Sequence, residues 1–226
     1  MLKRFIACTF LIAGFVTMAV AADENACKGD PNQWQQLYNG KDLTGWKHVG
    51  PGGDNVEDGL IHTHGGMGLL YWTGGRIGNC VIRVVFRMRD ENDNSGVFIR
   101  IPVEPREEWM PVHYGYEVQI DNHPEKSNED EYHETGMLYS LTKPLVKNAW
   151  KPGPEWNTME ITLDGPRTIV TLNGRRSQIS RKAIRSPTRS SISSRNAARA
   201  RHSAGSDCRT IATTTSCSSK KSRSSP

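Results

Sequence analysis

Hydrophobic and polar residues alternate along much of the chain between residues 80 and 173. In residues 81–89, Ile82, Val84, Phe86 and Met88 face one way and three arginines and Val85 face the other. The same period-two pattern covers residues 97–101, 116–121, 156–163 and 167–173. Because successive side chains of a β-strand point to opposite faces of a sheet, this alternation predicts half-buried strands. No segment shows a long 3.6-residue apolar period, so long helices are not expected.

Turn signals separate the predicted strands. Asn39-Gly40, Gly65-Gly66, Gly74-Gly75 and Asn173-Gly174 are pairs that favour tight turns. Many short strands at such spacing predict an all-β fold, an antiparallel sandwich or barrel. A body of about 150 residues is large enough to bury one core.

The N-terminus has the order of features found in a secretory signal. Lys3 and Arg4 precede an apolar run over residues 5–20, and Ala19-Val20-Ala21 gives a small-x-small pattern at its end. We therefore expect residues 1–21 to be a signal peptide that is removed on export, and residues 22–33 to be a linker. An N-terminal membrane anchor is the alternative. Export predicts a periplasmic or secreted protein with no membrane contact after cleavage, where Cys27 and Cys80 could pair.

Charge and aromatic residues are distributed unevenly. The net charge of the 226 residues is +5, yet residues 175–226 hold 13 Lys and Arg against one acidic residue, Asp207. All Trp, Tyr and Phe residues lie before Arg175. This division predicts a folded domain over residues 34–174 and a disordered Arg/Ser-rich tail over 175–226. Such a tail could bind nucleic acid or an anionic surface, but an exported protein is not expected to meet nucleic acid.

In a shifted reading frame, the codons of the tail can encode a different kind of sequence. If each codon is read from its third base, residues 203–221 permit Gly-Trp-Ile-Gly-Leu-Gln-Asn-His-Ser-Asp-Asp-Asp-Val-Val-Phe-Phe-Lys-Glu. In that frame, the third base of the Asp207 codon and the first two bases of the Cys208 codon form one codon, which can encode only Leu. The shifted text has strand alternation and aromatic residues, whereas the written text has neither. We therefore interpret the tail as out of frame, with a genuine low-complexity tail as the alternative.

One predicted strand carries polar side chains in a row. Glu117, Gln119 and Asp121 share a face, with roughly 7 Å between successive members. Two carboxyl groups and an amide in a cleft could bind a sugar and supply an acid and a base. Arg100 could stabilise developing negative charge or pair with Glu117. A solvated strand face without chemistry is the alternative.

Several strings resemble one family when taken together and in order. The chain resembles the 3-keto-disaccharide hydrolase-like domain, also called the 3-keto-glucoside lyase/hydratase domain, over residues 34–174. The strings are LYNGKDLTGW (37–46), NSGVFIR (94–100), YEVQID (116–121), TGMLY (135–139), EWNT (155–158) and LNG (172–174).

The resemblance implies an exported protein with a concanavalin-like jelly-roll sandwich. Members of the family finish with a Gly-x-Ile-Gly-Leu-Gln segment and a Phe-rich strand, so the written chain is expected to lack its last strands. The implied activity is cleavage of a 3-keto-glycoside by elimination and hydration. The catalytic candidates are Glu117 as base, Arg100 as stabiliser of the enediolate, and Asp121 or His123 as acid. The substrate-binding candidates are Gln119, Tyr139, Trp156 and Asn157.

Other roles stay open for some of these residues. Tyr139, Trp156 and Trp109 could equally pack in the core, and His123 could be a merely exposed loop residue. His113, His133 and Glu134 lie in an acidic stretch that could form a lid or a cation site, although a solvated loop is favoured. No cofactor is certain, and a divalent metal is possible. The expected partner is carbohydrate, and a non-catalytic glycan-binding module of the same fold is the competing function.

Overall fold

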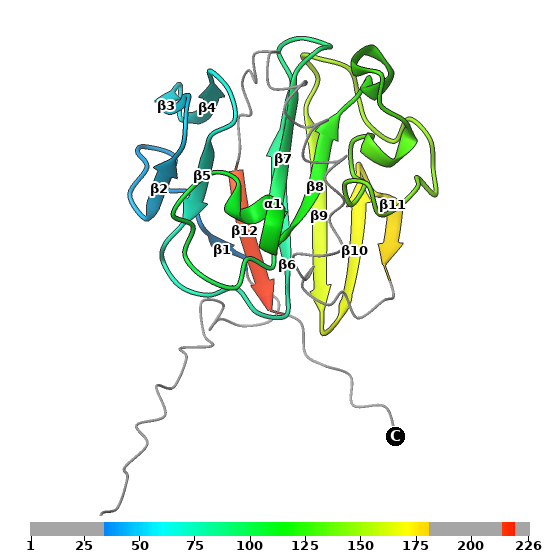
Figure 1. The fold of residues 1–226 in the computed structure, drawn as a ribbon. Coiled ribbons are helices and arrows are strands. Elements are labelled where there is room, and N and C mark those ends of the chain that lie inside the picture. The colour runs from blue at the N-terminus through cyan, green and yellow to red at the C-terminus, as the bar shows by residue number, and fades with distance from the viewer. Residues whose placement is uncertain (1–33, 181–213, 220–226) are drawn as a thin grey trace, which may run out of the picture.

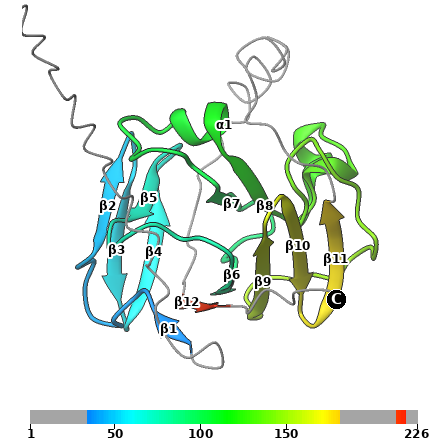
Figure 2. The same ribbon diagram turned by 90° about the horizontal axis from the view of Figure 1, so that it is seen from below.

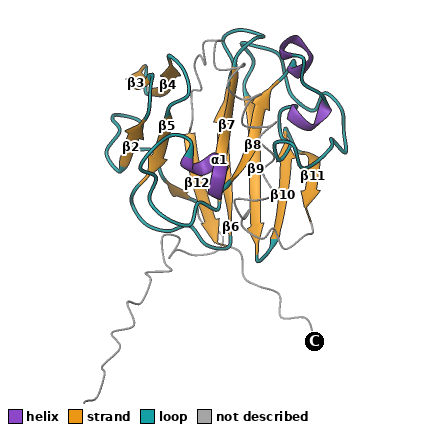
Figure 3. Cartoon of the chain, viewed as in Figure 1, coloured by secondary structure: helices purple, strands orange, loops and turns teal. Residues whose placement is uncertain are grey.

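The computed structural model describes residues 34–180 and the backbone of residues 214–219. One layer is a six-stranded antiparallel sheet (Figures 1 and 3). Its order is β1-β12-β6-β9-β10-β11. The strands are β1 (Gln35–Gln36), β12 (Thr214–Ser219), β6 (Cys80–Phe86), β9 (Asn157–Asp164), β10 (Arg167–Leu172) and β11 (Arg175–Ser180).

The facing layer consists of two-stranded antiparallel pairs (Figure 2). They are β2 (Trp46–Val49) with β5 (Leu69–Trp72), β3 (Gly53–Glu57) with β4 (Leu60–His64), and β7 (Asn94–Ile99) with β8 (Tyr116–Asp121). Helix α1 (Met110–Tyr114) precedes β8, and two short 3-10 turns, Pro124–Ser127 and Glu131–His133, follow it. Among the described residues no helix is long and apolar enough to cross a membrane.

The core lies between the layers and follows the predicted alternation. Burial along β6 alternates residue by residue, with Cys80, Ile82, Val84 and Phe86 inward. Ile82 is opposite Ile161 of β9 in the register of the sheet. Burying each such side chain is worth about 1.5–3 kcal/mol. The predicted antiparallel jelly-roll sandwich is thus confirmed.

The structured region extends further than the expected boundary at residue 174. The turn at Asn173-Gly174 leads into β11, whose residues pair with β10. Ser177 is fully buried there, and its hydroxyl donates to the carbonyl of Val170 at 3.1 Å. The prediction of a disordered tail over residues 175–226 is therefore wrong for residues 175–180, which the hairpin turn returns to an edge of the sheet, and for residues 214–219, which form β12 between β1 and β6. Residues 181–213 and 220–226, and the predicted signal and linker at 1–33, lie outside the described part.

Candidate active site

The outer face of the β7–β8 pair carries the predicted polar row. Alternation sends Val118 and Ile120 into the core, so Glu117, Gln119 and Asp121 share the opposite face. In the antiparallel register, Phe98, Gly96 and Asn94 of β7 are opposite these three residues, respectively. The row is therefore assembled as the sequence predicts, but Gln119 and Asp121 are only 1% and 4% exposed.

Glu117 is the member of the row that borders a cavity. It is half-buried, and the cavity of about 870 Å³ beside it lies between the β2–β5 and β7–β8 pairs. A Cβ atom on Gly96 would come within 2.1 Å of the Glu117 Oε1 atom. Only glycine at position 96 therefore leaves room for the carboxyl group above β7. Asn94 and Phe98 also line the cavity.

A chain of hydrogen bonds fixes the remainder of the row. The Gln119 amide donates to Asn94 Oδ1 at 3.2 Å, and the Asn94 amide donates to Asp121 Oδ2 at 3.0 Å. The other Asp121 oxygen accepts from the backbone N–H of His123 at 2.9 Å. These bonds hold Asp121 as a support for Asn94, and neither Gln119 nor Asp121 lines the cavity. The Gln119 Oε1 atom is buried without a hydrogen-bond partner among the described residues.

A second acidic group comes from the loop after β8. The Tyr139 hydroxyl donates to Glu129 Oε1 at 3.0 Å, while the Tyr139 backbone N–H donates to the Glu117 carbonyl at 3.0 Å. The Glu129 side chain is only 6% exposed. The His133 ring lies 4.4 Å from the Tyr139 ring, and its Nε2 contacts Ser140 Oγ at 2.8 Å. Tyr139 thus ties the loop to β8 beside Glu117.

Two carboxyl groups of the row hold their protons unusually tightly. Burial, reinforced by the negative charge of Glu129, raises the pKa of Glu117 to about 8. Burial also raises the pKa of Asp121 to about 6, against the opposing effect of the His123 backbone hydrogen bond. A carboxyl group with a pKa near neutrality can both accept and return a proton at physiological pH. Glu117, which also borders the cavity, is a perturbed group of the kind typical of functional sites.

Arg100 and Glu117 line the same cavity, but the Arg100 guanidinium is directed to the β9–β10 turn. The strand alternation would put it on the Glu117 face, but its φ of +58° ends β7 and breaks that alternation. Its guanidinium instead donates to the carbonyls of Gly165 and Arg167, at 2.7 and 3.0 Å, in the β9–β10 turn. Among the described residues Arg100 thus forms no ion pair with Glu117, because a local backbone angle overrides the period of the strand, and its role as stabiliser of the enediolate stays a prediction.

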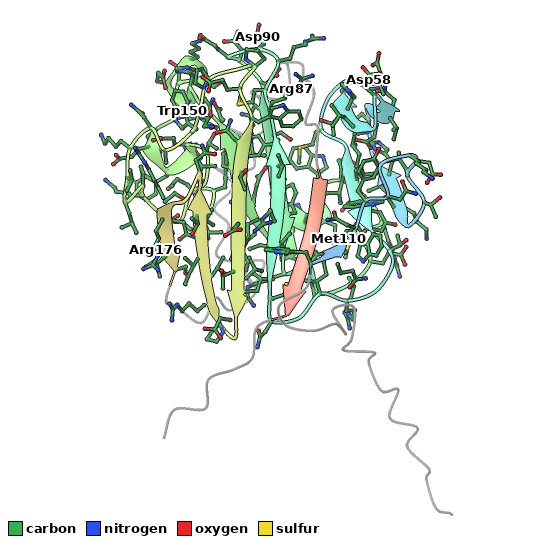
Figure 4. The ribbon with its side chains drawn as sticks, turned by 180° about the vertical axis from the view of Figure 1, so that it is seen from behind. Asp58, Arg87, Asp90, Met110, Trp150 and Arg176 are labelled. Atoms are coloured by element: carbon green, nitrogen blue, oxygen red, sulfur yellow. The ribbon has the colours of Figure 1, made fainter. Side chains whose placement is uncertain are left out.

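Two further predicted site residues, His123 and Trp156, do not line the cavity. The His123 Nδ1 atom contacts Glu125 Oε1 at 3.0 Å, and the ring packs edge-on against Trp150. Trp156 is 38% exposed, and the Arg87 guanidinium lies 5.1 Å from its ring. Arg87 follows β6 and is labelled in Figure 4, on the outward side of the six-stranded sheet. Trp156 therefore belongs to the opposite side of the molecule from the row.

Asn157 has a structural role that explains its complete burial. Its side-chain oxygen accepts from the Lys151 backbone at 2.8 Å, and its amide donates to the Lys151 carbonyl at 3.0 Å. It also accepts from the Asn173 amide at 2.8 Å. These bonds join the start of β9 to the hairpin turn after β10, so the prediction that Asn157 binds substrate has no support in its surroundings.

The structure adds cavity residues that the sequence pattern does not single out. Lys47 Nζ and the Tyr71 hydroxyl both donate to Glu104 Oε1 at 3.0 Å, and all three residues line the cavity. They come from β2, β5 and the segment after β7, so only the tertiary structure brings them together. The sequence gives no separate signal for Glu129, which is one of several acidic residues in the stretch after β8.

No metal centre is apparent in the part of the chain that the structure describes. Within residues 34–180, no three His, Cys, Asp or Glu side chains are grouped so as to hold a metal ion. Cys80 is a buried thiol whose pKa is raised by burial to about 11. Its predicted partner, Cys27, lies outside the described residues, and so that pairing stays a prediction.

Comparison with known proteins gives a family. A family model described as the 3-keto-alpha-glucoside-1,2-lyase-like domain matches residues 33–190. Two solved structures from Parabacteroides distasonis ATCC 8503, each named "putative glycosyl hydrolase", are 21% identical to the chain. One has a TM-score of 0.57 and covers 83% of this chain and 94% of its own. The other has a TM-score of 0.52 and covers 66% and 72%, respectively.

Each comparison supports a different conclusion. At this identity the two structures establish a shared fold. A search of curated proteins gave no match. The family model covers more than half of the chain, and its span includes the polar row, the Glu129 loop and β11. The chain therefore belongs to the 3-keto-alpha-glucoside-1,2-lyase-like domain family.

Proposed function

We propose that the protein cleaves 3-keto-glycosides by elimination followed by hydration, with Glu117 as the base. The observation that carries the proposal is a single carboxyl group with a pKa of about 8, held over Gly96 at the border of the cavity. Family membership supports the substrate class. The predicted signal peptide supports a site of action outside the cytoplasm.

The chemistry follows from the acidity of the sugar. A ketone at C3 acidifies the proton on C2, and the ionised Glu117 carboxylate removes it. The electron pair forms an enolate, which then re-forms the C3 carbonyl while the bond from C1 to the leaving oxygen breaks. The leaving oxygen takes a proton, and water adds across the new C1–C2 double bond. The net reaction is hydrolysis of the glycosidic bond.

The proton taken from C2 can return to the leaving oxygen through the same carboxyl group. A pKa of about 8 suits this double task, because neither protonation state is strongly favoured at neutral pH. We assign Asp121 and Asn94 to positioning, since Asp121 is held by Asn94 and the His123 backbone and does not border the cavity.

Stabilisation of the enolate oxygen needs donors near the cavity. Arg100 is the candidate from the sequence and lines the cavity, but its guanidinium donates to the backbone carbonyls of Gly165 and Arg167. Lys47 is the alternative that we propose, because it lines the cavity and its ammonium group has two hydrogens besides the one donated to Glu104, whereas Tyr71 donates its single hydroxyl hydrogen to Glu104. A cationic donor of this kind lowers the energy of developing negative oxygen.

The aromatic side chains around the cavity support a carbohydrate partner. Phe98 of β7 and Trp72 of β5 both line it, and Trp72 packs edge-on against Trp46 with 5.6 Å between ring centroids. Flat apolar surfaces of this kind suit the apolar faces of sugar rings. The same features would serve a module that binds glycans without cleaving them, so the experiment must separate the two functions.

The test measures release of the alcohol from a 3-keto-glucoside. It uses the chain in its present frame and the same gene restored to the shifted frame after the codon for Ser180, so that β11 keeps its residues. Glu117→Gln is compared with Glu57→Gln, which alters an exposed carboxylate on β3. We expect Glu117→Gln to lower kcat by about 10²–10⁴-fold and the control to leave it unchanged. Calorimetric binding of the substrate without any product would favour the binding module and reject the enzyme.

A further inference from the structure

The outward side of the six-stranded sheet carries positive charge although the domain as a whole is acidic. Residues 34–180 contain 15 Lys and Arg against 20 Asp and Glu, a net charge of −5. The alternation of the strands nevertheless directs Arg83, Arg87 and Arg176 away from the core. Figure 4 views the sheet from this side and labels Arg87 and Arg176. The cluster therefore reflects where the arginines are placed and not the overall composition.

One row of side chains crosses this face from strand to strand. Arg83 of β6 is opposite Glu160 of β9, Glu160 is opposite Thr171 of β10, and Thr171 is opposite Arg176 of β11. Neighbouring strands lie about 4.8 Å apart, so the row spans about 14 Å and has a guanidinium at each end. Arg83 donates from Nε and Nη2 to Glu160 Oε1, at 3.0 and 2.7 Å. Within residues 34–180, no carboxylate forms an ion pair with Arg176.

Two arginine–tryptophan pairs stand on the same face. The guanidinium carbon of Arg83 lies 3.8 Å from the centroid of the Trp34 ring, and that of Arg87 lies 5.1 Å from the Trp156 ring. Both contacts are within the range of a cation–π interaction. Arg83 and Arg87 are four residues apart in an extended chain, which separates the two pairs by about 13–14 Å.

The two pairs differ in what they offer to a ligand. The Nε and Nη2 groups of Arg83 already donate to Glu160, so this pair belongs to the fold of the sheet. Arg87 has no carboxylate partner in the described part of the chain, and Trp156 is 38% exposed. Between the pairs lie Val85 and Thr158, two small residues opposite each other. The Trp156 ring and the Arg87 guanidinium therefore stand above their neighbours with unused binding groups.

We propose that this face binds an acidic polysaccharide, with Trp156 and Arg87 as its central contacts and Arg176 as an outer contact. Trp156, Arg87 and Arg176 do not line the cavity that contains Glu117. The surface is thus a second site, and it does not depend on the proposed reaction.

The chemistry of the three side chains selects this class of ligand. An indole ring packs against the apolar face of a sugar ring, and a guanidinium can donate two parallel hydrogen bonds to a carboxylate. Arg87 and Arg176 are separated by the row in one direction and by four residues in the other, a diagonal of roughly 20 Å. Only a chain of several sugars can reach both. The predicted export of the protein favours a polysaccharide over nucleic acid.

The test is affinity electrophoresis of the full chain through gels that contain sodium polygalacturonate at 150 mM NaCl. We expect Arg87→Met and Trp156→Ala each to weaken binding at least tenfold. Trp156→Phe keeps an aromatic ring and should weaken it less than threefold, which separates loss of the ring from damage to the fold. Arg106→Met is the matched control, because it removes the same charge from an exposed position after β7, and it should leave binding unchanged.

Each contrary result overturns the proposal in a different way. Residues 181–226 hold 11 Lys and Arg against Asp207 alone, so equal effects of Arg87→Met and Arg106→Met would assign the binding to that segment. Equal retardation by neutral dextran would remove the requirement for acidic sugars. Duplex DNA that binds as tightly, and is lost with Arg87→Met and Trp156→Ala, would make the face a general polyanion surface. An absence of retardation by polygalacturonate would reject the site outright.

Discussion

Replacement of Glu117 with glutamine should stabilise the folded protein at alkaline pH and leave its stability unchanged near pH 4. Burial and the charge of Glu129 raise the pKa of Glu117 from 4.5 to about 8 in the folded state. Glutamine has the shape of the protonated acid and cannot ionise. The two proteins should therefore differ only where the unfolded chain releases the Glu117 proton and the folded chain retains it.

The magnitude follows from the interval between the two pKa values. Below the unfolded pKa both states carry the proton, so the full stability is present. As pH rises from 4.5 to about 8, the unfolded state releases its proton first, and the free energy of unfolding falls. At 1.36 kcal/mol for each pH unit, the loss reaches about 5 kcal/mol and then stays constant. This is comparable with the whole stability of a marginal domain.

Urea unfolding of the frame-restored protein at a series of pH values measures this difference. The unfolding free energies of the parent and Glu117→Gln should coincide near pH 4 and diverge by about 5 kcal/mol near pH 9. Glu57→Gln on exposed β3 is the matched control and should follow the parent throughout. Parallel curves for the parent and Glu117→Gln would show that the carboxyl group is not desolvated, which would also remove the main support for its role as base.

Three other outcomes test the site. The kcat/KM for a 3-keto-glucoside should rise with pH through about 8, since the base must be ionised; a plateau already reached at pH 6 would point to another base. Gly96→Ala should displace the Glu117 carboxyl group, with about a 10²-fold loss of kcat and about 1–3 kcal/mol of stability, whereas Gly78→Ala, which has open space around it, should do neither. Arg100→Met should cost about 1–3 kcal/mol by removing bonds to the β9–β10 turn while kcat changes little; a selective loss of kcat with normal stability would restore its catalytic role.

The alternation of apolar and polar residues was sufficient to predict the strands. The patterns over residues 81–89, 116–121 and 167–173 match β6, β8 and β10 to within a few residues at each end. This succeeds because a strand between two layers must bury every second side chain, whatever its neighbours are. The same rule predicts that Glu117, Gln119 and Asp121 share one face, as they do.

The sequence could not place residues whose direction depends on a single backbone angle or on distant segments. Arg100 has the right period for the Glu117 face, and a positive φ turns it to the β9–β10 turn. Trp156 and Asn157 belong to a string that resembles the family. Trp156, however, packs with Arg87 on the outer side of the six-stranded sheet, and Asn157 accepts a hydrogen bond from Asn173 in the turn after β10. Periodicity gives the face of a strand but does not say which loop covers it.

The sequence by itself determined the strands, the all-β class and the identity of the polar row, because these follow from local alternation. Only the tertiary structure decided which member of the row can meet a ligand. The Glu129 loop and Asn94 enclose Gln119 and Asp121, whereas Glu117 borders the cavity between β5 and β7. Burial and the charge of Glu129 then set the pKa of Glu117. Desolvation and charge proximity arise from segments far apart in the chain, and so they exist only once the layers have packed.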